Sequence, residues 1–341
     1  MKLLFILDSF FFRDRTIVIP MCFSHYKENS KHQVLLCYTD QVLTTLGTDT
    51  DVDLIVFFDV DTLRSGNKYS FLFNLNIPVF VSSIDFFYFK NCTDCKWIQK
   101  CTGLLHFGHA SKLLGSYKDH FPNKIIRSLS GRYVNTGRFR DYKLDKKYDI
   151  LIYGSRKHMN MIENHGADQA YKLKWESHHG KPLPANWNFY PLRERLYHIL
   201  VKNKNKYKLR VLSDEVFDTT NEKLSEVINS SWLTVATRAR ADIPMAKYFE
   251  IGASYSGILG NIPSDYEDVF KNNVVEVTEW MTDEEILSTI DKALEDKQKL
   301  QEMINRMGER MHTDYSLAAG TRDMDKAFQD ILKVDKSPGF S

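Results

Sequence analysis

The sequence predicts an α/β protein with two open, mostly parallel sheets that face one cleft. Short apolar segments of strand length alternate with helical segments along the chain, as in sheets whose two faces are covered by helices. A charged, turn-rich stretch, SGRYVNTGRFRDYKLDKKYD, interrupts this alternation at 130–149, and the same rhythm then begins again. With 341 residues the chain is also long for one core, so we expect two domains.

The first half begins with a strand rather than with a secretory signal. Asp8 interrupts the apolar run of KLLFILD, and no cleavage site of small residues follows it. Further apolar runs and helical spacings extend the pattern. Strands are expected at 2–8, 32–39, 52–60, 77–85 and 103–108, and helices at 16–29, 69–75 and 109–120.

The second half repeats the alternation after a boundary within 141–147. Strands are expected at 148–155, 207–213, 232–237, 256–262 and 273–278, and helices at 190–203, 221–231, 245–254, 266–272 and 282–296. Thr282 with Glu285 three residues later is a helix start signal. We therefore expect domains at 1–143 and 144–314. A last helix at 315–341 has apolar residues at helical spacing, namely Met324, Phe328 and Ile331.

The composition favours no nucleic-acid or membrane partner. Lys and Arg number 46 against 44 Asp and Glu, which gives a formal net charge of +2. No window reaches the roughly 18 apolar residues of a transmembrane segment. The odd number of cysteines, five, in a large chain without a signal indicates reduced thiols. We expect a cytoplasmic protein, and the sequence leaves its oligomeric state unknown.

The turn YGSRK follows the strand that opens the second half. Gly154 and Ser155 allow the backbone to turn tightly, and Arg156 then lies at the carboxyl end of the strand. Backbone N–H groups and a guanidinium group at such a place can bind a pyrophosphate. An ordinary exposed turn is the alternative for this motif taken alone.

Two acids, Asp242 and Glu250, flank an expected helix start in RARADIPMAKYFEIGAS. Pro244 favours the first turn of a helix, which places Asp242 before the helix and Glu250 about two turns inside it. The free N–H groups of the helix start suit a phosphate, and the acids can accept hydrogen bonds from hydroxyl groups. Arg238, Arg240 and Lys247 add positive charge. Together these residues describe a site for a sugar nucleotide.

The segment 221–317 resembles the donor half of GT-B glycosyltransferases, in particular the glycosyl transferase family 1 group that includes spore-maturation-type proteins. A basic residue before FE, a small-residue turn, an apolar strand, IPSDYEDVF, VVEV, MTDEEI and HTDYSL carry the resemblance. The spacing Asp242-x7-Glu250 matches the Glu-x7-Glu motif of the family, with Asp in the first place. The first half supports the resemblance only by its α/β rhythm.

The resemblance implies two Rossmann-like domains, 1–143 for the acceptor and 144–314 for the nucleotide-sugar donor. The last helix, 315–341, would cross back to the acceptor domain and serve with 141–147 as a hinge. It implies a glycan or glycoconjugate acceptor, a UDP- or GDP-linked donor and no bound cofactor or metal. Glu250 would hold the ribose hydroxyls, and Asp242 would reach the transferred sugar or its phosphate. Arg156 and Lys247 would neutralise the diphosphate, and Ser213 would lie near the base.

Metal-binding alternatives rest on short motifs. Asp59 and Asp61 in VFFDVDTLRSG follow a strand and resemble the DxD of the GT-A fold or the nucleophile motif of haloacid-dehalogenase phosphatases. A zinc site could use Cys92, Cys95, Cys101, His106 and His109, but the second ligand pair of a zinc finger is missing. The polar insertion 157–188 carries four histidines and is interpreted as a solvated loop, with a metal or catalytic role of the histidines as the alternative.

A transferase needs a general base for the acceptor hydroxyl, which we expect from the first half. Asp85 at the end of an expected strand, His109 just after another, and His25 are the candidates. A non-catalytic α/β protein that binds a sugar or nucleotide is the hypothesis from another class. It would keep Glu250 and the basic residues and need no base.

Overall fold

The computed structural model describes residues 1–7, 19–48, 51–58, 67–82, 100–107, 121, 123–129, 133–154, 176–177, 190–212, 222–238 and 245–335. The chain forms two units. The first comprises Met1–Tyr133 and Leu317–Ser341, and the second comprises Val134–Ser316. Each unit has its own parallel sheet with helices, so the predicted α/β class is confirmed.

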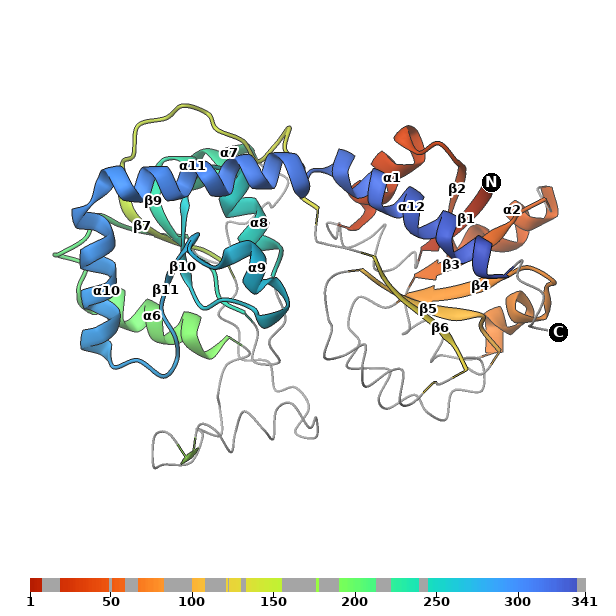
Figure 1. Ribbon diagram of the computed structural model, residues 1–341, viewed down its shortest axis with the longest axis horizontal. Coiled ribbons are helices and arrows are strands. Elements are labelled where there is room, and N and C mark those ends of the chain that lie inside the picture. Colours follow the sequence, from red (N-terminus) through yellow and green to blue (C-terminus); the bar gives the residue numbers. More distant parts are fainter. Residues whose placement is uncertain are drawn as a thin grey trace. The chain divides into compact units, whose positions relative to one another are not determined.

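The sheet of the first unit has the strand order β2-β1-β3-β4-β5-β6, and all pairings are parallel (Figure 1). Its strands are β1 (Lys2–Leu7), β2 (Gln33–Tyr38), β3 (Leu54–Phe58), β4 (Val79–Ser82), β5 (Gly103–Phe107) and β6 (Ile125–Leu129). Its helical segments are α1 (Ile19–Asn29), η2 (Thr39–Gln41), α2 (Val42–Thr48), η3 (Asn67–Asn74) and α12 (Leu317–Asp335).

Alternating side chains of β1 enter two different cores. Leu4 and Ile6 pack with residues of α2 and η3 on one face of the sheet. Leu3, Phe5 and Leu7 pack on the other face with α1 and α12. This period of two is expected when both faces of a strand are covered. The last helix of the chain is therefore part of the core of the first unit (Figure 1).

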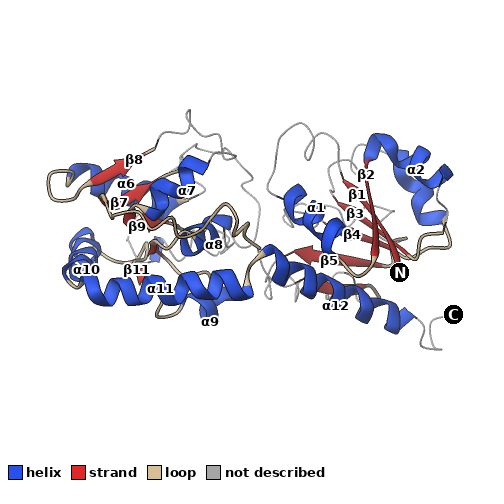
Figure 2. Ribbon diagram, turned by 90° about the horizontal axis from the view of Figure 1, so that it is seen from above, coloured by secondary structure: helices blue, strands red, loops and turns tan. Residues whose placement is uncertain are grey.

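The second unit has the strand order β11-β10-β9-β7-β8, again with parallel pairings. Its strands are β7 (Tyr148–Ile152), β8 (Leu209–Val211), β9 (Ser231–Val235), β10 (Gly257–Gly260) and β11 (Val274–Glu276). Its helices are α6 (Pro191–Lys202), α7 (Glu222–Asn229), α8 (Ala246–Ala253), η6 (Ser264–Tyr266), α9 (Glu267–Phe270), α10 (Asp283–Glu295) and α11 (Lys297–Asp314). Helices cover both faces of this sheet (Figure 2).

Most predicted elements match the structure, with local differences. The capping box of Thr282 and Glu285 at the start of α10 is confirmed. The segment expected as an α-helix at 69–75 is instead a 3-10 helix, η3. The one expected at 266–272 is a 3-10 turn, η6, followed by one turn of α-helix, α9. The expected helix at 109–120 lies outside the described residues. Strand β6 and helix α2 were not predicted.

The two units divide at Tyr133 and Val134, ten residues before the expected boundary. The segment after Val134 packs on the second unit, where Val134 and Phe139 are buried in its core. Asp141 accepts a hydrogen bond from Asn229 Nδ2 at 3.1 Å. The charged composition that suggested a domain boundary therefore belongs to a segment that is held by polar contacts and by two buried apolar side chains.

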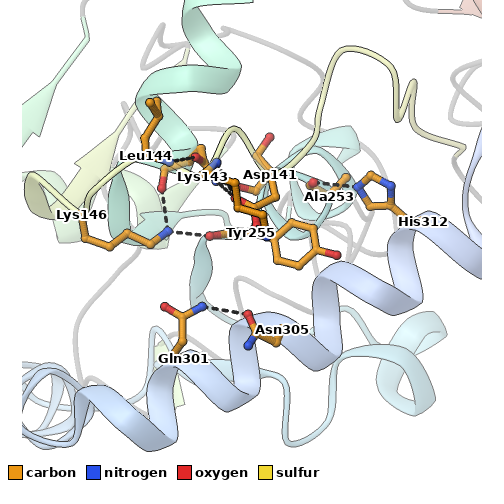
Figure 3. A network of polar contacts seen from close by, with 11 residues as sticks. Asp141, Lys143, Leu144, Lys146, Ala253, Tyr255, Gln301, Asn305 and His312 are labelled. Atoms are coloured by element: carbon orange, nitrogen blue, oxygen red, sulfur yellow. Dashed lines mark hydrogen bonds and ion pairs between the residues drawn. The ribbon is translucent and has the colours of Figure 1, made fainter.

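Lys146 joins the amino ends of the second sheet. Its Nζ donates to the carbonyl oxygens of Asn229 and Tyr255 at 2.6 Å each and to that of Ser231 at 3.1 Å. Figure 3 shows the amine directed at the Tyr255 carbonyl. Burial lowers the pKa of Lys146 to about 8. Since Lys146 precedes β7, Ser231 begins β9 and Tyr255 precedes β10, this contact ties the amino ends of three strands together.

Candidate functional site

The strand order of the second sheet identifies a candidate ligand site. The chain passes from β7 to β8 on one side and then to β9 on the other side of β7, so the direction of the connections changes between β7 and β9. Ligands of open α/β sheets bind outside the carboxyl ends of the strands at such a switch point. Tyr153 and Gly154 follow β7 there, and Thr237 and Arg238 follow β9.

Gly154 is required for the turn after β7. Its φ of +91° lies in the region that side chains rarely adopt, and a Cβ on it would overlap Lys247 Nζ. The Lys247 amine occupies this space because it donates to the Tyr153 carbonyl oxygen at 2.7 Å and lies 4.2 Å from the centre of the Tyr153 ring. The turn therefore holds a positive charge against the end of β7.

Glu250 lies one helical turn after Lys247 on α8 and contacts the same tyrosine. The Tyr153 hydroxyl donates to Glu250 Oε2 at 3.4 Å. Burial, and then the charge of Glu250, raise the pKa of Tyr153 well above its usual range, so the phenol stays protonated and acts as a donor. Tyr153 thus lies between a cation and a carboxylate, both of which α8 supplies.

Arg193, on α6, adds a buried positive charge beside this turn. The residue is only 2% exposed, and its guanidinium group lies 3.9 Å above the ring of Tyr190. Its Nη1 lies 3.9 Å from the place that a Cβ on Gly154 would occupy. Even without touching a ligand, a guanidinium group in a low-dielectric environment attracts anions at this edge more strongly than one in water.

A second polar group joins the carboxyl ends of β9, β10 and β11. Arg238 Nη2 donates to Glu279 Oε1 at 3.1 Å, and Asn261 Nδ2 donates to Glu279 Oε2 at 3.0 Å. The Arg238 N–H donates to Asn261 Oδ1 at 2.9 Å. Glu279 and Asn261 are buried, whereas the Arg238 side chain is 24% exposed. The result is an arginine that reaches solvent and is anchored by a buried carboxylate.

Tyr248 links the two groups electrostatically. Its hydroxyl donates to the Asn261 carbonyl oxygen at 2.6 Å. Burial raises the pKa of Tyr248 well above its usual range, while the guanidinium groups of Arg238 and Arg193 act in the opposite direction. The carboxyl edge of the second sheet combines Arg193, Arg238 and Lys247 with two carboxylates.

The structure brings together four of the residues predicted from the sequence. Gly154, Lys247 and Glu250 meet around Tyr153, and Arg238 lies at the neighbouring end of β9. The remaining predicted donor residues lie outside the described residues, as do two candidate bases, both DxD acids and most of the zinc and histidine candidates. These are Ser155, Arg156, Ser213, Arg240, Asp242, Asp85, His109, Asp59, Asp61, Cys92, Cys95 and the histidines of 157–188.

The start of α8 differs from the prediction. The helix begins at Ala246 with Met245 as N-cap, so Glu250 is its fifth residue and lies in the second turn rather than two turns inside. The shift moves Glu250 closer to the helix start. It also places Lys247 in the first turn, where its side chain can reach back to the end of β7.

His25, the candidate base within the described residues, lies in the middle of α1. Its Nδ1 is 3.1 Å from Thr321 Oγ1 of α12. The ring therefore contacts the helix that covers one face of the first sheet. In an α/β sheet the start of the helix that follows a strand lies near the carboxyl edge, where ligands bind. His25 is in the middle of α1 and therefore away from that start.

The sequence-based prediction missed Arg193, Asn261 and Glu279. Glu279 directly follows the expected strand 273–278, and an acid at a strand end was a usable signal because the carboxyl ends of parallel strands share an edge. Asn261 was included in an expected strand. Arg193 and Arg195 are both polar positions of one amphipathic helix, and nothing in their spacing indicates that Arg193 is the buried one.

Comparisons with known proteins support the fold. No protein-family model and no curated protein matches the sequence. Sucrose-phosphate synthase from Thermosynechococcus elongatus superposes with a TM-score of 0.59 at 8% identity, over 98% of this chain and 100% of that one. HepE from Anabaena, in complex with UDP-glucose, gives 0.58 at 10% identity, over 97% and 100%.

A third solved structure, WaaG, is described as a glycosyltransferase involved in lipopolysaccharide biosynthesis. It superposes with a TM-score of 0.50 at 11% identity, over 94% of this chain and 99% of that one. At these identities the likeness concerns the fold. The chain has the GT-B fold, as the sequence predicted.

Proposed function

We propose that the protein is a glycosyltransferase that moves a sugar from a nucleotide-sugar donor to a hydroxyl group of a glycan or glycoconjugate. One observation carries the proposal: at the switch point of the second sheet, Lys247 and Glu250 of α8 bracket the end of β7, beside the arginine at the end of β9. A diphosphate needs cations, and a ribose needs a hydrogen-bond acceptor. This edge offers both.

The chemistry that these groups can support is stabilisation of the leaving nucleoside diphosphate. Negative charge develops on the diphosphate as the glycosidic bond breaks, and fixed cations stabilise that charge. Lys247 and Arg238 are assigned this role, with Arg156 as a further cation. Glu250 is assigned to the ribose hydroxyl groups, and Asp242 to the transferred sugar or its phosphate.

The proposal extends to the nucleotide of the donor and to the subgroup of glycosyltransferases. HepE has been crystallised with UDP-glucose, which supports a UDP-linked donor here, with a GDP-linked donor as the alternative. The motif Asp242-x7-Glu250 supports placement in the family 1 group with spore-maturation-type proteins. Ser213 is assigned to the nucleobase, and a bound metal is not required because the phosphate charge meets side-chain cations.

The general base is assigned to the first unit. Asp85, His109 and His25 are the candidates, and the contact of His25 with Thr321 gives that ring a structural partner already. Asp85 ends one expected strand and His109 follows another, where a side chain can reach an acceptor hydroxyl. We therefore favour these two over His25.

Incubation with UDP-, GDP- and ADP-sugars, with nucleoside diphosphate release as the readout, tests the proposal. We expect release with one class of donor, stimulated by the right acceptor. Nucleotide binding without release from any donor, over a broad acceptor panel, would favour a binding protein. Failure to bind any nucleotide sugar would contradict both.

A further inference from the structure

Both oxygens of the Glu279 carboxylate accept hydrogen bonds although the residue is buried. The residue is 2% exposed, and its two oxygens accept hydrogen bonds from Arg238 Nη2 and Asn261 Nδ2. Its backbone is held as well, because Arg195 Nη1 donates to the Glu279 carbonyl oxygen at 3.1 Å. The carboxylate is therefore held at both of its oxygens, and its backbone is held as well.

Stability alone is a weak reason for such a carboxylate. Removing a carboxylate from water costs several kcal/mol, and buried ion pairs are often no more stabilising than apolar side chains of the same volume. The five N–H donors of an arginine form a planar fork on a flexible side chain, so anchoring it lowers the entropic cost of ordering it around a ligand. An anchored arginine is thus more useful for binding than for folding.

The position of Arg238 fits this use. It follows β9 at the switch point, and its side chain is 24% exposed while its carboxylate partner is 3% exposed. Its own N–H is fixed by Asn261 Oδ1. The backbone and the head group of the arginine are therefore both held from the buried side, and the exposed part of the side chain lies at the edge where ligands of such sheets bind.

We propose that Glu279 is a positioning residue that holds the Arg238 guanidinium for the diphosphate of the nucleotide-sugar donor. Asn261 fixes the Glu279 carboxylate and the Arg238 backbone in the same network. The inference rests on the proposed function, because it assigns Arg238 a donor phosphate. It adds a carboxylate that acts on the ligand only through the arginine.

The test uses the full-length protein and the variants Glu279→Gln, Arg238→Gln and the double variant. The probe is UDP, GDP or ADP, whichever the wild type binds most tightly, and the matching nucleoside is titrated in parallel by NMR. We expect Glu279→Gln and Arg238→Gln each to weaken diphosphate binding about tenfold or more, with nucleoside binding unchanged. The double variant should bind within about twofold of Arg238→Gln.

The outcomes separate the inference from the function on which it rests. If the wild type binds none of the diphosphates, the proposed function fails and the inference fails with it. If the wild type binds one and Glu279→Gln binds it equally well, Glu279 is only structural and the inference alone is overturned. A lower melting temperature with unchanged affinity overturns the inference in the same way.

Glu279→Asp keeps the test decisive if Glu279→Gln does not fold. This variant keeps the buried negative charge that pairs with Arg238, but it draws the carboxylate one methylene group away from the guanidinium. We expect Glu279→Asp to weaken diphosphate binding, with nucleoside binding unchanged. Wild-type diphosphate affinity in Glu279→Asp would overturn the inference, as would wild-type affinity in Arg238→Gln.

Discussion

Tyr153 is held by two side chains of α8 that lie three residues apart. Lys247 Nζ bonds its carbonyl oxygen and Glu250 accepts from its hydroxyl, so the end of β7 and the start of α8 are fixed together. Side chains at this spacing share one face of a helix. A ligand at this edge therefore meets a cation and a carboxylate whose separation is set by the helix.

Replacing Glu250 by Ala should weaken nucleotide-sugar binding without unfolding the protein. Loss of a charged hydrogen-bond partner for the ribose should cost about 1.5–3 kcal/mol of binding free energy. Calorimetric titration of the donor measures the change. Glu302→Ala is the matched control, because Glu302 is an exposed acid on α11 of the same unit. Equal donor affinity in the two variants would remove Glu250 from the site.

At the residue scale, the sequence indicated the site residues that belong to a local sequence motif. Lys247 and Glu250 belong to one segment with a recognisable spacing, and Gly154 follows an obvious strand. Glu279 could not be paired with Arg238 in this way, because the two are 41 positions apart and meet only when β9 and β11 lie in one sheet. The network depends on strand order, which no local pattern contains.

Lys146 bonds three backbone carbonyl groups at the amino edge of the second sheet. Replacing Lys146 by Met removes a donor from the carbonyl oxygens of Asn229, Ser231 and Tyr255, of which that of Ser231 keeps the Ser256 hydroxyl. The free energy of unfolding should therefore fall by about 2–4 kcal/mol at pH 7. Urea unfolding measures the change. Lys147→Met is the control, because Lys147 is the exposed neighbour. Similar losses in both variants would contradict a special role for Lys146.

The wild type and the Lys146→Met variant also test how the free energy of unfolding depends on pH. The pKa of Lys146 is lowered to about 8 in the folded protein, whereas an unfolded lysine titrates near about 10.4. Between these values the unfolded chain binds more protons, so this residue makes the free energy of unfolding rise with pH. The stability advantage of the wild type over Lys146→Met should grow by about 1–3 kcal/mol from pH 8 to pH 10. A constant difference would contradict the lowered pKa.

Strongly apolar elements were predictable and weakly patterned ones were not. Strands such as β1 and β3 are nearly continuous apolar runs, which is the pattern of strands buried on both faces. Strand β6, with the sequence IIRSL, lies at the sheet edge and carries two polar residues in five positions. Its pairing with β5, rather than its own pattern, makes it a strand.

Helix α12 belongs to the core of the first unit, so deleting the helix is a poor test of what it contributes. Removal of 318–341 would expose that core, so a point substitution is the better experiment. Phe328→Ala should lower the free energy of unfolding by about 3–5 kcal/mol, because a fully buried ring is lost. Lys326→Ala on the exposed side of α12 is the control. Equal stability of the two variants would contradict the packing.

Asp325 adds a polar anchor to the same helix. It accepts hydrogen bonds from Tyr26 and Ser30 at 2.9 and 2.6 Å, and His32 Nε2 lies 3.8 Å from its Oδ1. Burial, the largest effect, lowers the pKa of His32 although Asp325 acts in the opposite direction. The apolar spacing of α12 predicted a helix, but its burial within the first unit depends on this polar contact as well.

At the scale of the whole molecule, the sheets of the two units share one strand order around their first strands. In the part of the chain that the structure describes, no helix is both long and apolar enough to cross a membrane. The carboxyl edge of the second sheet carries the cations and acids described above. The corresponding switch point of the first sheet, between β1 and β3, is followed directly by residues outside the described ranges.

Transfer should persist in EDTA. The proposed mechanism neutralises the diphosphate with Lys247 and Arg238 rather than with a divalent cation, so chelation should leave the rate within about twofold. Release of nucleoside diphosphate, with and without EDTA, measures it. A requirement for added manganese or magnesium would favour the alternative that uses Asp59 and Asp61, and an Asp59→Asn variant would then identify the site.

Amide hydrogen exchange with and without a saturating nucleoside diphosphate tests the central claim most directly, because it maps the binding site on the whole chain. The account predicts slower exchange after β7 at 153–154, after β9 at 236–238 and in α8, with little change at the amino edge around Lys146 or in α12. Unchanged exchange at these segments under saturation, or protection confined to the amino edge or to the first unit, would contradict it.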